Sequence, residues 1–174
     1  MSGMNDLLLE EDWAHRKNTI RYLAELLDAG QGVSGPKASL AIAATQALPR
    51  HLTAGDERRM RLDKSLVLYD NPSAIALCMY REQHAVCQKL SHGNQVPRPD
   101  LLNCVDGCIC AVRTDENLIE LRNVVEQLRK QARLSPKPLA QSLLAEADEK
   151  EAIAERFEQN RLTLMPTPKI RPLE

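Results

Sequence analysis

All five cysteines of this sequence lie between Cys78 and Cys110, and four of them form two spaced pairs, Cys78 with Cys87 and Cys104 with Cys108. Thiolate sulfur is a preferred ligand of zinc, and a structural zinc ion takes four protein ligands in a tetrahedron. The two pairs would supply these four ligands. They therefore predict a structural Zn2+ site in the middle of the chain.

Two further donors leave the ligand set open. His84 could replace Cys78 or Cys87 in a Cys3His set, and Cys110 is a spare thiol beside the second pair. The spacing C-x8-C-x16-C-x3-C is less specific than paired CxxC knuckles, so unliganded cysteines, an iron–sulfur cluster or a redox switch are the alternatives. An odd number of cysteines without a secretory signal argues against a disulfide framework and favours a reducing, cytoplasmic setting.

A second group of residues could contact phosphate. The arginines predicted for DNA binding are Arg58, Arg59, Arg61 and Arg113. The alternative for the first three is a solvated helix face, because Asp56 and Glu57 are their neighbours. The overall charge does not decide the matter, since 23 Lys and Arg balance 24 Asp and Glu.

Catalysis finds little support in the sequence. It contains no recognisable Ser/His/Asp arrangement, HExxH motif, phosphate-binding glycine loop or paired-carboxylate motif. We therefore expect a protein that is not an enzyme.

The sequence predicts mainly helices for the elements that must position these residues. With one Phe, three Tyr and one Trp, the core must be built from Leu, Ile, Val and Ala, a composition that suits packed helices, and we predict an all-α fold. Apolar spacing predicts helices over 10–29 and 38–48, and Thr53 is the predicted N-cap of a short arginine-containing helix. Residues 73–89 also follow a helical pattern, whereas 65–70 suit a short strand or extended coil.

The second half of the chain carries the clearest periodicity. Thr114 opens a long helix, the Ser135–Pro138 segment interrupts it, and residues 139–162 form another, so we predict an antiparallel helical hairpin. The predicted regions are an N-terminal helical region (1–64), a zinc-binding segment (65–113), the hairpin (114–162) and a flexible tail (163–174).

The cysteine segment resembles a known group of proteins. The stretches YDNPSAIALCMYREQHAVC and PDLLNCVDGCICAVRTDENLIELR are similar to the C-terminal cysteine-containing segment of poorly characterised bacterial proteins associated with mobile elements and site-specific tyrosine recombinases. The matching positions are Cys78, Cys87, Cys104, Cys108, Arg113, Thr114 and Asp115. Cys110 departs from that pattern. The resemblance implies a role in DNA rearrangement, and because the recombinase catalytic Arg, His and Tyr set is not recognisable, it implies an accessory or detached module.

These observations lead to two expected functions. The first is a zinc-stabilised, non-catalytic DNA-binding accessory or regulatory protein of a mobile element or recombination system, with DNA or a recombinase as its partner. The alternative is a zinc-stabilised protein-interaction module that acts through the C-terminal hairpin, pairing with another helix or with a second copy of the chain. No stretch approaches the ~18 apolar residues that cross a bilayer, so we expect a cytoplasmic protein with no membrane partner.

Overall fold

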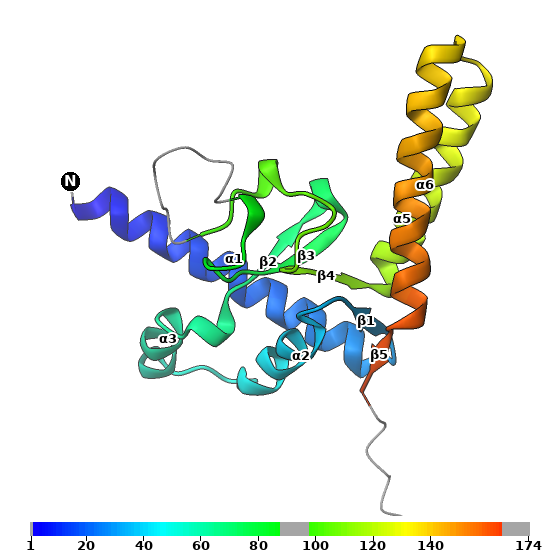
Figure 1. The fold of residues 1–174 in the computed structure, drawn as a ribbon. Coiled ribbons are helices and arrows are strands. Elements are labelled where there is room, and N and C mark those ends of the chain that lie inside the picture. Colours follow the sequence, from blue (N-terminus) through cyan, green and yellow to red (C-terminus); the bar gives the residue numbers. More distant parts are fainter. Residues whose placement is uncertain (1, 88–97, 165–174) are drawn as a thin grey trace, which may run out of the picture.

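The computed structural model describes residues 2–87 and 98–164, and it combines helices with an antiparallel sheet (Figure 1). The α-helices are α1 (Ser2–Asp28), α2 (Ala38–Ala47), α3 (Ala54–Arg61), α5 (Asp115–Arg133) and α6 (Lys137–Gln159). The strands are β1 (Gly32–Ser34), β2 (Leu68–Asn71), β3 (Ala76–Met79), β4 (Ala111–Thr114) and β5 (Leu162–Thr163). The prediction of an all-α fold is therefore wrong, because the middle of the chain forms a sheet.

The five strands lie in the order β2-β3-β4-β1-β5, and every neighbouring pair is antiparallel. Strand β4 joins the two halves, since Val112 pairs with Leu77 of β3 and Thr114 pairs with Val33 of β1. Residues 73–89 were expected to be helical, but they contain β3, whose four residues are all buried. The backbone pairing of β3 on both edges outweighs the local helix preference of its sequence.

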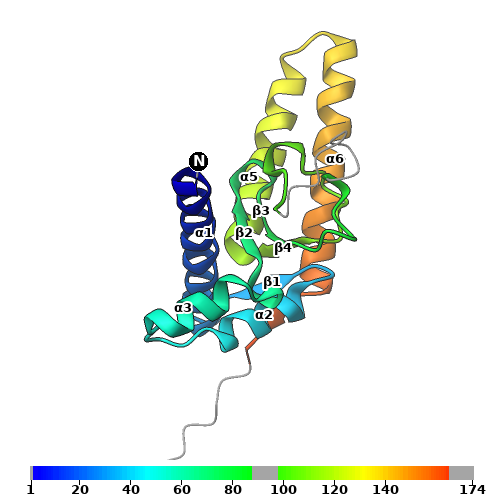
Figure 2. The same ribbon diagram turned by 90° about the vertical axis from the view of Figure 1, so that its left-hand side faces the viewer.

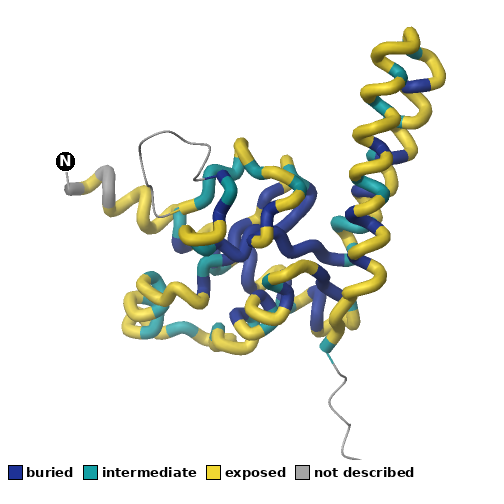
Figure 3. Tube along the Cα trace, viewed as in Figure 1, coloured by how far each residue is buried: buried dark blue, intermediate teal, exposed yellow. Residues whose placement is uncertain are grey.

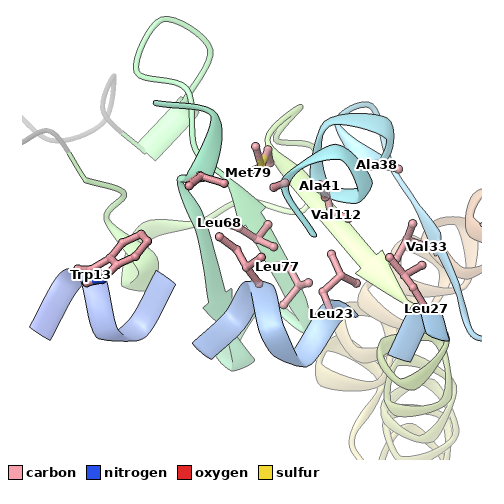
Figure 4. Packing of buried hydrophobic residues seen from close by; sticks show 13 residues of the cluster. Trp13, Leu23, Leu27, Val33, Ala38, Ala41, Leu68, Leu77, Met79 and Val112 are labelled. Carbon is pink, nitrogen blue, oxygen red and sulfur yellow. The ribbon is translucent and has the colours of Figure 1, made fainter. Parts of the chain in front are cut away.

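One face of the sheet is covered by α1 and α2. Trp13, Leu23 and Leu27 of α1 repeat at helical spacing, and they belong to the same buried cluster as Leu77 and Met79 of β3 (Figure 4). The predicted helices 10–29 and 38–48 correspond to α1 and α2, with α1 beginning earlier. This aliphatic layer is the main hydrophobic core of the protein.

Gly35 fixes how closely β1 and its following turn approach the rest of the sheet. Its φ is +129°, and a Cβ at this position would lie 2.4 Å from the carbonyl oxygen of Ala111. Only glycine accommodates both the backbone conformation and the close approach. The turn that leads from β1 into α2 therefore rests directly on β4.

Helices α5 and α6 form the predicted antiparallel hairpin. The Thr114 side chain accepts a hydrogen bond from the Asn117 backbone N–H, and the Asn117 side chain accepts one from the Thr114 N–H, so a capping box begins α5. Arg122 pairs with Glu158 across the hairpin. Figures 1 and 2 both show the hairpin rising away from the sheet, and its outer surface is largely exposed (Figure 3).

No helix in the described part of the chain is both long and apolar enough to cross a membrane. The predicted flexible tail, 163–174, lies outside the described residues except for Thr163, which belongs to β5, and Leu164, which packs against the main core.

Candidate functional site

The cysteines lie on the face of the sheet opposite α1 and α2. Successive side chains of a strand point to opposite faces, so Leu77 and Met79 enter the main core while Cys78 and Tyr80 point the other way. Cys110 immediately precedes β4, and its carbonyl oxygen accepts a hydrogen bond from the Met79 N–H at 2.8 Å. The alternation of side chains along the strand thus decides which face Cys78 points to. A helical interpretation of this segment does not predict that direction.

On this second face lie residues of the described segments 80–87 and 98–110, which connect β3 and β4. The buried residues that pack together there form the cysteine cluster, which consists of Tyr69, Cys78, Tyr80, Ala85, Cys87, Cys108 and Cys110. Val67, Val86 and Leu101 lie at its edge. Four of its seven members are cysteines. Among the described residues, this cluster is therefore rich in thiol groups, whereas the aliphatic core beneath α1 and α2 contains none.

The thiols are close enough to influence one another. Burial raises the pKa of the Cys78 thiol, and the neighbouring Cys110 and Cys104 thiols raise it further. The pKa values of Cys104 and Cys110 are raised as well, chiefly by burial. The Cys110 thiol donates to the backbone carbonyl oxygen of Arg81 at 3.9 Å. Because burial favours the protonated form of Cys78, Cys104 and Cys110, a metal that binds these thiols must displace their protons.

The structure separates the predicted ligands by exposure. Cys78, Cys87 and Cys108 are buried within the cluster, whereas Cys104 is only partly buried at its rim. Cys110 is completely buried inside the cluster. His84, the predicted alternate ligand, is exposed and does not belong to the cluster.

The described residues contain no formed metal-binding arrangement. Within 2–87 and 98–164, no three His, Cys, Asp or Glu side chains are placed so that they could hold a metal ion together. The cluster therefore brings suitable donors near one another without setting them in a tetrahedron. Zinc binding would require the thiol side chains to reorient.

The four arginines predicted to bind DNA fall into two separate places. Arg58, Arg59 and Arg61 lie on α3, a helix with a Thr53 capping box, whereas Arg113 lies on β4. The Arg59 side chain is 76% exposed and bonds Asp56 of its own helix. Figure 1 shows α3 and the β4 end of the sheet well apart, so these residues do not form one surface.

Arg113 is buried rather than displayed. Its Nη2 donates to Asp106 Oδ1 at 3.3 Å, and Lys150 of α6 lies 3.5 Å from the other oxygen of that carboxylate. Desolvation lowers the pKa of Arg113, although Asp106 opposes this change. Sequence reasoning missed Asp106 and Lys150, because no local spacing connects a turn residue with a helix so far along the chain.

Comparison with known proteins identifies no relative of this chain. No protein-family model matches the sequence, no curated protein matches it, and no solved structure matches the fold. The resemblance to mobile-element proteins consequently stays a prediction.

Proposed function

We propose that the protein is a non-catalytic, zinc-stabilised accessory protein that associates with DNA, and that zinc fastens Cys87 and the 104–108 turn to the sheet. The observation that supports the zinc site is the convergence of thiols from β3, from Cys87 and from the turn before β4 on one face of the sheet. Four thiolates would close the coordination of a structural zinc ion and leave no open position for chemistry. The ligands proposed are Cys78, Cys87, Cys104 and Cys108.

Zinc analysis of the purified full-length chain tests this site. We expect one zinc ion per chain, released by a strong chelator together with loss of thermal stability, because metal binding contributes to folding. The variants Cys87→Ser and Cys104→Ser should lose the metal, whereas Cys110→Ser, a matched change in the same cluster, should keep it. A wild-type chain that folds fully without zinc would refute the proposed site, and loss of zinc only in Cys110→Ser would refute the ligand set.

The DNA part of the proposal rests on α3 and on the sequence resemblance. Arg58, Arg59 and Arg61 all lie in its last turns, and Arg59 extends into solvent. Guanidinium groups that neutralise phosphates release counterions, so binding weakens as salt rises. Arg113 is left out of this surface because its side chain is only 10% exposed and is paired with Asp106.

Fluorescence anisotropy with a duplex oligonucleotide tests the DNA proposal. Three phosphate contacts give a slope of log K against log salt of about −2.7, so affinity should fall about 40-fold between ~50 and ~200 mM salt. Arg58→Ala should reduce the slope by about one unit. Arg129→Ala, the same change on the hairpin, should leave it unaltered. Absence of binding, or binding that does not respond to salt, would contradict the proposal.

A second candidate function is self-association through the hairpin. The observation that favours it is the hairpin tip, where Leu134 is 90% exposed and Leu139 is 52% exposed. Sedimentation of the wild-type chain and of Leu134→Ser at matched concentrations tests it. A concentration-dependent dimer that the substitution weakens is expected, and a strict monomer at high concentration would exclude it.

A further inference from the structure

A cavity lies where the base of the hairpin meets the sheet. Its volume is about 400 Å³, and its walls come from the turn after β1, the 106–108 turn, β4 and α6. This size falls within the range of small-molecule sites. The cavity lies beside the cysteine cluster but is distinct from the proposed zinc ligands, of which only Cys108 lines it.

Two guanidinium groups line this cavity from different elements, Arg113 from β4 and Arg156 from α6. The charge of Arg156 is close enough to lower the pKa of Arg113, after the larger effect of desolvation. The Nε of Arg113 is buried and has no hydrogen-bond partner among the described residues. Two guanidinium groups that line one cavity are the complement of an anion.

The charges within the cavity leave a positive excess. Asp106 is the one acidic residue among the lining residues, and both of its oxygens already have cationic partners, Arg113 on one and Lys150 on the other. Arg156 bonds the carbonyl oxygen of Ala152 in its own helix, and it has no carboxylate partner in the part of the chain that the structure describes. Its charge is therefore free for a ligand.

Part of the remaining wall is apolar. Ile153 and Phe157 of α6 and Pro36 of the β1 turn line the cavity, and Phe157 is almost fully buried. Pro36, which is exposed, is the most accessible apolar residue of this wall. A ligand that fits has an anionic group at the guanidinium end and a flat or apolar body against Pro36.

We propose that this cavity binds a small phosphate monoester of the nucleoside monophosphate type, with its phosphate between Arg113 and Arg156. A tetrahedral phosphate presents oxygens in several directions, so it can bond two guanidiniums from different walls, whereas a carboxylate presents two oxygens in one plane. This site is independent of the proposed DNA surface on α3. At this site Arg113, which was predicted from the sequence to bind DNA, binds a small ligand instead.

Calorimetric titration of the full chain at constant ionic strength tests the site with four probes: adenosine 5′-monophosphate, inorganic phosphate, adenosine and succinate. We expect the monophosphate to bind at least 10-fold more tightly than adenosine or succinate, and inorganic phosphate to compete with it. Equal affinity for adenosine, tighter binding of succinate, or no binding of either phosphate would overturn the proposal.

Variants assign the binding to the cavity. Arg156→Gln should weaken monophosphate binding at least 10-fold, and this side chain lies on an exposed helix position, so the fold should tolerate the change. Arg113→Lys keeps the charge but loses the planar fork, so it should also weaken binding. Arg122→Gln makes the same charge change elsewhere on the hairpin and should leave the affinity unchanged. Equal affinities for Arg156→Gln and the wild type would refute the site.

Discussion

Replacing Gly35 by alanine tests the close approach of the turn after β1 to strand β4. Its φ of +129° is a conformation that L side chains rarely adopt, and the new Cβ would meet the Ala111 oxygen at 2.4 Å and the Val112 Cα at 3.3 Å. Both neighbours are backbone atoms of β4, which cannot turn aside as a side chain can. Strained backbone of this kind costs about 1–3 kcal/mol by itself. The steric overlap adds to that cost, so we expect a total of about 3 kcal/mol or more.

Two other glycines separate the contributions. Gly30 has a φ of +86° with nothing within 4 Å of its Cβ position, and Gly107 has neither a positive φ nor a near neighbour. Gly30→Ala therefore has only the cost of the unfavourable backbone conformation. Alanine also lowers the entropy of the unfolded chain, which offsets part of this cost, so we expect a net loss of about 0.5–1 kcal/mol in the free energy of unfolding. Gly107→Ala should be neutral or stabilise by about 0.5 kcal/mol.

Urea and thermal unfolding of the three variants measure these differences. In a chain of 174 residues, 1 kcal/mol corresponds to about 2–4 °C in Tm, so Gly35→Ala should melt at least about 6–12 °C below the wild type. The expected order of stability is Gly107→Ala, then Gly30→Ala, then Gly35→Ala. A Gly35→Ala variant that is as stable as Gly30→Ala would refute the close packing of the β1 turn on β4.

Three further changes test other parts of the fold. Thr114→Ala removes the N-cap of α5 and should lower the free energy of unfolding, measured in urea, by about 1 kcal/mol. An unchanged free energy of unfolding would show that the cap is not formed. Bonding to Arg161 lowers the pKa of Asp115 in the folded protein. The ion pair therefore stabilises the fold fully above the pKa of Asp115 in the unfolded chain, near ~4. This stabilisation is lost as the pH falls through the lower pKa of the folded protein. Asp115→Asn should therefore flatten the acid limb of stability against pH, and an unchanged limb would contradict the pairing. Leu77→Ala should cost about 2–5 kcal/mol because the side chain is fully buried, whereas Ile119→Ala on the exposed hairpin face should cost far less.

The helices were predictable because their signals are local. Thr114 and the apolar repeat after it specify where α5 begins and which face it buries, and Thr53 specifies where α3 begins. Residues 65–70 were a candidate strand and overlap β2, but the rest of the sheet was missed because its strands are at most four residues long, too short for period-two alternation to emerge in the sequence. Tyr69 and Cys78 become partners only when β2 and β3 pair.

The same difference between local signals and long-range pairing applies to the candidate sites. The sequence by itself determined that the thiols are clustered and that long amphipathic helices follow them, since residue type and short-range spacing are enough for both. Tertiary structure alone decided that Cys78 faces away from the main core, that Arg113 is buried against Asp106, and that Arg156 lines the same cavity as Arg113. These arrangements arise from strand pairing and from packing of residues distant in the chain, and no local pattern encodes them.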